Sequence, residues 1–271
     1  RDWSSDVCSS DLDELVVNRP PFASTLVVRG IAKQRGSATV AATLFEETAQ
    51  SIAARQALAE SLRLSAVIED PRDDIAAPPA AFSVVCHPHP LHGGTMDNKV
   101  ATTLSRTFHE LGVPTIRFNF RGVGQSEGAW DEGRGESDDM LAVIHHHLAA
   151  PELSGLPLAL AGFSFGGFVA ARTHDRLVQA AQADPGEPMP AQLVLVSPAT
   201  TRFEVPSVPA HTLVVEGEQD DVVPLTAILD WARPQGLPVT VIPGTGHFFH
   251  GQLPLLREVV RRHLRLVAAG G

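Results

Sequence analysis

The sequence predicts a doubly wound α/β fold, in which helices cover both faces of a mostly parallel β-sheet. Short apolar runs alternate with helical patterns from about residue 61 to the C-terminus. This alternation requires crossover connections, which join parallel strands through helices packed on the sheet. The chain shows no internal repeat, and no run reaches the roughly 18 apolar residues of a membrane-spanning helix.

The predicted strands are short runs rich in Val, Leu, Ile and Phe, and Gly, Pro or polar residues bound each run. They lie at residues 63–70, 81–86, 114–120, 157–163, 192–198, 211–217 and 238–244. The predicted helices lie near residues 97–111, 136–149, 165–183, 225–233 and 252–267. The segment between 163 and 192 holds one helix and a polar loop, so we expect no large cap domain.

Composition divides the chain into three parts. Residues 1–12 ("RDWSSDVCSSDL") resemble the translation of a sequencing-library adapter, so we expect a cloning or assembly scar that carries no function. Residues 13–60 contain possible strands and a helix-like run but no recognisable chemistry, and we treat them as an N-terminal extension of unknown role. Residues 61–271 form the predicted α/β domain.

Charge and cysteine content limit the classes of binding partner and favour one cellular compartment. The formal net charge is −10 and no basic stripe is visible, which argues against nucleic-acid binding. The absence of a long apolar run argues against a membrane partner. Outside the adapter-like segment, Cys86 is the one cysteine, which excludes an intramolecular disulfide and favours the cytoplasm. The oligomeric state cannot be read from the sequence.

The sharpest motif follows the strand at residues 157–163. Gly162, Ser164 and Gly166 form the pattern G-x-S-x-G between a buried strand and a helix, the context of a nucleophile elbow. Small residues allow the sharp turn that exposes a strained serine hydroxyl, and the following helix directs its N-terminal N–H groups at the site. Ser164 is therefore the candidate nucleophile.

A serine hydroxyl needs a base and a group that orients the base, and in this kind of fold they follow in the order Ser, Asp or Glu, His. Asp220 and Asp221 follow one later strand, and His247 follows another. His250 is the alternative base, but His247 comes first after its strand. Position does not separate the two aspartates; we choose Asp220 and expect Asp221 to cap the loop or face solvent.

Five stretches together resemble the α/β-hydrolase superfamily, in particular small bacterial hydrolases related to dienelactone hydrolases and esterases. They are "HPHPLHGGTMDNKV", "RFNFRGVGQSEG", "GFSFGG", "GEQDDVVP" and "PGTGHFFHG", and the resemblance covers about residues 62–267. The family pattern G-x-x-D corresponds to Gly217 and Asp220, which supports Asp220 over Asp221. His92 departs from the family, where an aromatic residue is more common.

The segment "CHPHPLHGG" suggests a metal site, because His87, His89 and His92 lie close together. It lacks the paired Cys and His spacing of common zinc sites. The prolines and glycines indicate a loop that leaves a strand. We therefore predict no bound metal, with a metal site as the alternative.

The same loop is expected to supply half of an oxyanion hole, which needs two backbone N–H donors. One donor is the amide of Phe165, directly after the nucleophile. Pro88 and Pro90 have no N–H, so the second donor is the amide of His89 or of Leu91. His89 corresponds better to the superfamily position.

Other conspicuous residues have structural interpretations. Arg121 is expected to brace neighbouring loops by hydrogen bonds. Glu136, Asp138 and Asp139 suit the first turn of a helix, where negative charge is favourable. The run at residues 145–147, three histidines, is expected on the exposed side of that helix.

Together these observations predict a serine hydrolase that cleaves a small ester-type substrate through a Ser-Asp-His triad and an acyl-enzyme, without a cofactor. A peptidase, thioesterase or acyltransferase with the same triad is the enzymatic alternative. A non-catalytic binding protein with this fold is the remaining alternative; it usually lacks a triad member, and none is missing here.

Overall fold

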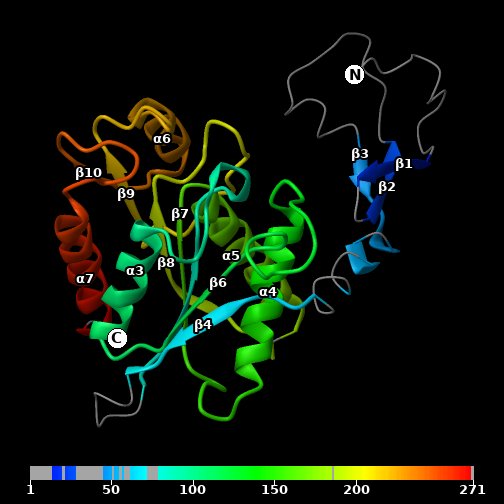
Figure 1. Ribbon diagram of the computed structural model, residues 1–271, viewed down its shortest axis with the longest axis horizontal. Helices are drawn as coiled ribbons and strands as arrows, with labels where there is room; N and C mark the ends of the chain where they lie inside the picture. The colour runs from blue at the N-terminus through cyan, green and yellow to red at the C-terminus, as the bar shows by residue number, and fades with distance from the viewer. Residues whose placement is uncertain are drawn as a thin grey trace. The chain divides into compact units, whose positions relative to one another are not determined.

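The computed structural model describes residues 14–19, 22–28, 45–50, 52–54, 57, 62–71, 79–184 and 186–269 (Figure 1). The chain divides into two compact units, Arg1–Leu62 and Arg63–Gly271. The predicted adapter-derived segment, residues 1–12, lies outside the described residues. None of the described helices has the length and apolar character needed to cross a bilayer.

The described strands of the first unit form a small antiparallel sheet in the order β1-β2-β3. Pairing runs from β1 (Glu14–Arg19) to β2 (Phe22–Val28) and from β2 to β3 (Phe45–Glu47).

The second unit contains a seven-stranded sheet in the order β10-β9-β8-β7-β5-β6-β4. The edge strand β4 pairs antiparallel with β6, and the other pairs are parallel. The strands are β4 (Ala66–Glu69), β5 (Phe82–Cys86), β6 (Thr115–Phe118), β7 (Leu158–Phe163), β8 (Pro190–Val196), β9 (Leu213–Gly217) and β10 (Val239–Ile242). The predicted α/β fold class is confirmed.

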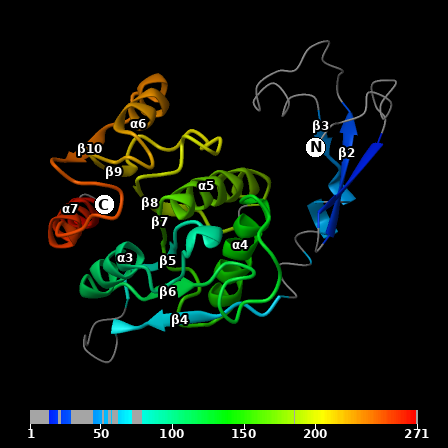
Figure 2. The ribbon, with the colours of Figure 1, turned by 45° about the horizontal axis from the view of Figure 1, so that its top comes forward.

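Helices cover both faces of this sheet (Figure 2). One face carries α3 (Lys99–Glu110) and α7 (Leu253–Ala269); the other carries α4 (Arg134–Leu148), α5 (Phe165–Ala183) and α6 (Leu225–Ala232). Strand β8 is apolar on both faces, as a strand covered on both sides must be. Val194 and Val196 belong to the core under α3 and α7. Leu193 and Leu195 belong to the core under α4 and α5. Strand side chains alternate between faces, so a buried strand must be apolar on both.

The start of α4 corrects one prediction. Helix α4 begins at Arg134 rather than near residue 136, because the Glu136 carboxylate accepts the backbone N–H groups of Asp131 and Gly133. Glu136 therefore lies in the first turn, as predicted. Asp138 and Asp139 lie beyond it, so the prediction of a first-turn position is wrong for both.

Asp138 and Asp139 instead pair with arginines from other parts of the fold. The Asp139 carboxylate accepts from the Arg121 side chain at 2.6 Å, and both side chains are fully buried. Asp138 accepts from Arg176 of α5 at 2.6 Å. Arg121 has a bracing role, as predicted, but it holds its own loop to a helix rather than to another loop.

Candidate active site

Ser164 occupies the sharp turn between β7 and α5. Its φ of 57° lies in the left-handed region, which side chains other than glycine rarely adopt. A Cβ at Gly166 would collide with the carbonyl oxygens of Cys86 and His87, and one at Gly162 would collide with the carbonyl of Gly166. The G-x-S-x-G sequence is therefore a steric requirement of the turn.

Hydrogen bonds join Ser164 to His247 and His247 to Asp220. The distance from His247 Nε2 to Ser164 Oγ is 3.0 Å, and the distance from His247 Nδ1 to Asp220 Oδ2 is 2.7 Å. All three residues are buried, and they come from the ends of β7, β10 and β9. The structure thus brings together the three residues that the sequence analysis selected.

The two alternatives from the sequence analysis lie elsewhere. Asp221 and His250 are both exposed. Asp220 turns inward because its Oδ1 accepts the backbone N–H groups of Val222, at 2.9 Å, and Val223, at 2.7 Å. These bonds close a tight loop after β9, which leaves Oδ2 to face the histidine.

The pairing determines which imidazole nitrogen carries the proton. An ionised Asp220 can only accept, so His247 donates through Nδ1 and its Nε2 is left to accept from Ser164. Burial opposes the ionised form of Asp220, but hydrogen bonds from His247 and Val223 hold the pKa of its carboxyl below the usual value. This arrangement can remove a proton from the serine hydroxyl.

Glu216, a residue that the sequence analysis missed, lies behind Asp220 at the end of β9. Its side chain is fully buried, and its Oε1 accepts from Ser197 Oγ and from the Gly217 N–H, both at 3.0 Å. Among the described residues, Oε2 meets no donor, and the Glu216 carboxyl group interacts with that of Asp220.

Burial, reinforced by the negative charge of Asp220, raises the pKa of Glu216 to about 9. Glu216 is therefore protonated at neutral pH, and its O–H can donate to Asp220. The sequence signal was an acidic residue inside the apolar run "HTLVVEG", directly before the family pattern G-x-x-D. A carboxyl group is rarely buried unless it has a partner.

His87 holds the histidine-rich loop in place. Its Nδ1 lies 2.7 Å from the carbonyl oxygen of Pro88, and its Nε2 lies 3.1 Å from the backbone nitrogen of Phe120. One tautomer satisfies both contacts, with Nδ1 donating and Nε2 accepting. Burial lowers the pKa of His87 to about 4, so the ring is neutral and both nitrogens are engaged.

The predicted oxyanion donors differ in their availability. The Leu91 N–H already donates to Nδ1 of His89 at 3.2 Å, which favours the backbone amide of His89 as the loop donor. Phe165 begins α5 directly after Ser164, where the first N–H groups of a helix have no intrahelical partner. The His89 ring is neutral near pH 7, because burial lowers its pKa to about 4.

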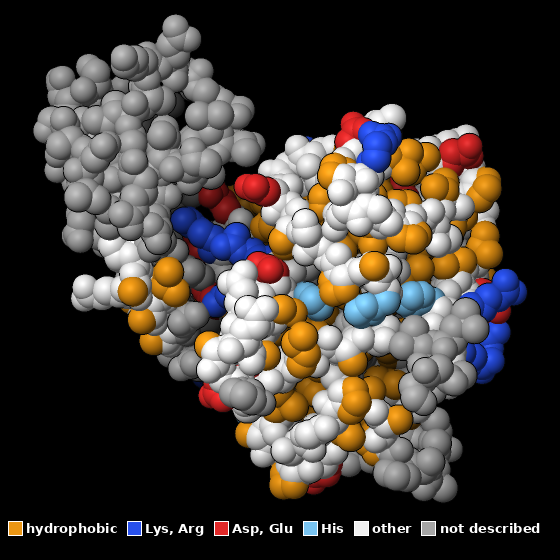
Figure 3. All heavy atoms as spheres, turned by 180° about the vertical axis from the view of Figure 1, so that it is seen from behind, with side chains coloured by type: hydrophobic (Ala, Val, Ile, Leu, Met, Phe, Trp, Pro, Cys, Tyr) orange, Lys and Arg blue, Asp and Glu red, His pale blue; other side chains and the backbone are white. Residues whose placement is uncertain are grey.

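Figure 3 shows a row of histidine side chains on one face of the molecule. In the described part of the chain, no group of three or more His, Cys, Asp or Glu side chains is arranged to hold a metal ion. Residues 145–147 follow the predicted pattern on α4, where His145 and His146 are exposed and His147 is half-buried.

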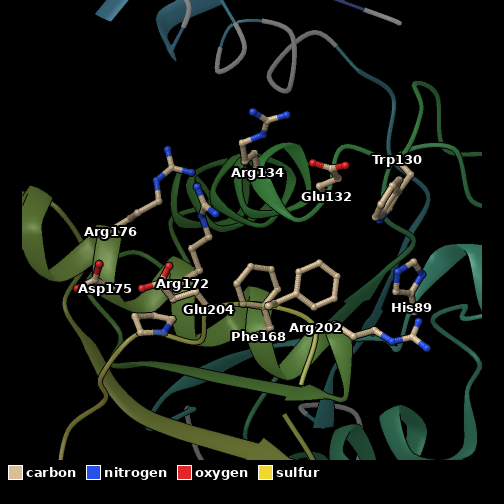
Figure 4. A pocket seen from close by; sticks show the side chains of 12 residues that line it. His89, Trp130, Glu132, Arg134, Phe168, Arg172, Asp175, Arg176, Arg202 and Glu204 are labelled. Atoms are coloured by element: carbon tan, nitrogen blue, oxygen red, sulfur yellow. The ribbon is translucent and has the colours of Figure 1, made fainter. Parts of the chain in front are cut away.

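Two adjoining cavities lie at the site. The smaller has a volume of about 390 Å³, and Ser164 and His247 are among the residues that line it. The larger has a volume of about 820 Å³ and lies beside it (Figure 4). His89, Arg202 and Phe203 line both cavities.

Comparisons with known proteins were made at the level of families, sequences and structures. No family model matches the chain. An α/β serine hydrolase without a lid from Xanthomonas campestris is 36% identical, with a TM-score of 0.64, over 74% of this chain and 88% of that one. An α/β serine hydrolase homologue from Coxiella burnetii is 30% identical, with a TM-score of 0.56, over 95% of this chain and 100% of that one. An uncharacterized protein from Rickettsia prowazekii is 27% identical over 211 residues, which are 69% of this chain and 80% of that protein.

Proposed function

Because the chain belongs to the α/β-hydrolase superfamily, we propose that it is a serine hydrolase that cleaves small ester substrates through an acyl-enzyme. One observation carries this proposal: Ser164, His247 and Asp220 form a continuous hydrogen-bonded line that opens into a cavity. All three belong to the unit Arg63–Gly271, so we propose this unit as the catalytic domain.

In the first step, Nε2 of His247 takes the proton from Ser164 while Oγ attacks the ester carbonyl carbon. The carbonyl oxygen becomes negative, and the backbone N–H groups of Phe165 and His89 stabilise it. Removing one such donor typically lowers the rate by about 10²-fold or more. Asp220 keeps the imidazole in the productive tautomer and stabilises its protonated form.

The intermediate then collapses. The protonated His247 gives its proton to the departing alcohol oxygen, and the acyl group remains on Ser164. In the second half of the reaction His247 takes a proton from water, which attacks the acyl carbon and releases the acid. None of these steps requires a cofactor.

The accessibility and size of the site support small substrates. Each connection between β5 and α7 contains at most one α-helix, with no inserted domain in the residues described, which are all of this range except residue 185. A cavity of about 390 Å³ is at the small end of the range for ligand sites. The buried free thiol of Cys86 supports the proposal of a cytoplasmic enzyme.

The test is intact mass spectrometry after treatment with a serine-directed fluorophosphonate. The parent chain should gain one adduct, Ser164→Ala should gain none, and His247→Ala should react far more slowly. His250→Ala is the matched control, because this exposed histidine lies three positions further on and should leave labelling unchanged.

No adduct on a well-folded parent chain, or equal labelling of Ser164→Ala, would show that Ser164 is not an activated nucleophile. Turnover of short-chain 4-nitrophenyl esters then establishes the reaction. Adding a competing alcohol separates hydrolysis from acyl transfer, because an acyltransferase would form the new ester at the expense of the free acid.

A further inference from the structure

The larger cavity beside Ser164 is rich in arginine, although the chain as a whole carries a formal net charge of −10. Its lining includes four arginines and three carboxylates: Arg134, Arg172, Arg176, Arg202, Glu132, Asp175 and Glu204. They come from the start of α4, from α5 and from the loop between β8 and β9. A guanidinium at a concave surface can bind an anionic ligand when no carboxylate of the protein already neutralises it.

The arginines of this cavity differ in how they are neutralised. Arg176 pairs with Asp138 at 2.6 Å, and Arg134 pairs with Asp131 at 3.1 Å. Within the described part of the chain, Arg202 has no carboxylate at ion-pair distance, and its Nη1 instead lies 3.3 Å from Nε2 of His92. The charge of Arg202 is therefore available to a ligand.

Arg202 also has the right position to contact a substrate. It lines both the larger cavity and the smaller cavity that contains Ser164 and His247. Figure 4 shows Arg202 beside His89, at the end of the larger cavity opposite Arg176. A molecule whose ester group reaches Ser164 would pass this guanidinium.

The surface beside Arg202 is aromatic. The rings of Phe168 and Phe203 are stacked, with centroids 4.7 Å apart, and both line the larger cavity together with Trp130. Apolar surface next to the Arg202 guanidinium suits a ligand with a carbon skeleton and one anionic end.

We propose that the preferred substrates are esters that carry an anionic group, a carboxylate or a phosphate, which Arg202 binds while Ser164 attacks the ester. The planar guanidinium presents paired N–H donors that match the oxygens of either group. This inference rests on the proposed hydrolase function and names its substrate class.

Three chromogenic esters of matched length test the inference. They are 4-nitrophenyl monoglutarate, its uncharged amide analogue 4-nitrophenyl 4-carbamoylbutanoate, and 4-nitrophenyl 4-phosphonobutanoate. The readout is the ratio of kcat/KM for each anionic ester to kcat/KM for the amide. We expect a ratio of about fivefold, as for a well-placed exposed ion pair. The higher of the two ratios identifies the anion, and added salt should reduce both.

Variants then assign the preference to one residue. Arg202→Gln should bring the ratio close to one, and Arg202→Lys should keep part of it because the charge remains. Arg257→Gln is the matched control; Arg257 is also exposed but pairs with Glu110, which joins α7 to α3 away from both cavities.

Two results would overturn the inference while the hydrolase proposal stands. One is turnover of all three esters at similar rates, and the other is a ratio that Arg202→Gln leaves unchanged. Absence of turnover with every ester, together with absence of a fluorophosphonate adduct, would overturn both proposals.

Discussion

Two groups of buried carboxylates in the described part of the unit Arg63–Gly271 differ in how their charge is balanced. In α4, Asp139 lies against Arg121, and the two fully buried side chains are 2.6 Å apart. At the end of β9, Glu216 and Asp220 lie against each other, with His247 on the far side of Asp220. The first place uses a permanent cation, and the second uses a proton and an imidazole.

We interpret the charge of Asp139 as structural and the charge of Asp220 as part of the chemistry of the site. Asp139 holds the pKa of Arg121 above its usual value, although burial acts in the opposite direction. Burial also raises the pKa of Asp139, but the guanidinium beside it remains a permanent cation. The imidazole of His247 can accept and donate a proton during a reaction, which a guanidinium cannot do in a protein. We therefore expect substitutions in the first cluster to change stability and substitutions in the second to change rate.

The largest expected effect is on the rate, from Asp220→Asn. An asparagine at this position can donate to Nδ1, which stabilises the wrong tautomer and leaves Nε2 unable to accept from Ser164. By comparison with other serine hydrolases, kcat should fall by about 10⁴-fold with the fold intact. Single-turnover measurement of ester cleavage, with circular dichroism as the check on folding, provides the test.

Asp221→Asn is the matched control for this substitution. Asp221 is the next residue and is exposed, so the same chemical change there should leave the rate within a factor of about two. A rate for Asp220→Asn within about tenfold of the parent would contradict the assignment of Asp220 as the group that orients His247.

The second effect is on stability, from Arg121→Met. This change leaves the Asp139 carboxylate buried without a cation, which should lower the free energy of unfolding by about 3–5 kcal/mol. Urea denaturation measures the loss. The double variant Arg121→Met/Asp139→Leu should recover much of it, because neither charge then remains.

Arg176→Met provides the comparison for Arg121→Met. Arg176 also pairs with an aspartate of α4, but its side chain is 21% exposed, so water can replace part of the lost interaction. We expect the larger loss from Arg121→Met. Equal losses from the two substitutions would contradict the idea that complete burial makes the Arg121 pair more important for stability.

The smallest effect is a change in the pH dependence of stability, from Glu216→Gln. The pKa of Glu216 is about 9 in the folded chain, above the ordinary value of 4.5, so the folded state keeps a proton that the unfolded state releases. This contribution is complete below the unfolded pKa and is lost as pH rises through the folded pKa, by at most about 1.4 kcal/mol per pH unit.

Glutamine removes this titration but keeps a donor toward Asp220. The stability of Glu216→Gln relative to the parent chain should therefore rise between about pH 5.5 and about pH 8, as measured by urea denaturation. The exposed neighbour Glu218 provides the control variant Glu218→Gln. Parallel pH profiles for Glu216→Gln and the parent would mean that Glu216 is already ionised in the folded state.

Much of the fold and part of the site follow from short stretches of sequence. Strand and helix positions are readable because side-chain periodicity and turn residues are local properties of the chain. The turn at Ser164 is readable for the same reason, since a steric requirement for glycine on both sides leaves a fixed pattern. The choice of His247 over His250 needed only the observation that His247 is the first histidine after its strand.

Only the tertiary structure shows the features of the site that depend on contacts between residues distant in the chain. Glu216 matters because the loop after β9 folds back and places Asp220 against it, and Asp139 matters because Arg121 reaches it from another element. Leu91 differs from His89 as a donor only because its N–H is already bound. The burial and the hydrogen-bond partners of a residue depend on how distant segments pack around it. They cannot be read from the type of that residue or from its spacing to its neighbours in the sequence. The sequence therefore selected the residues that we propose as the reacting groups, and the three-dimensional arrangement determined their surroundings.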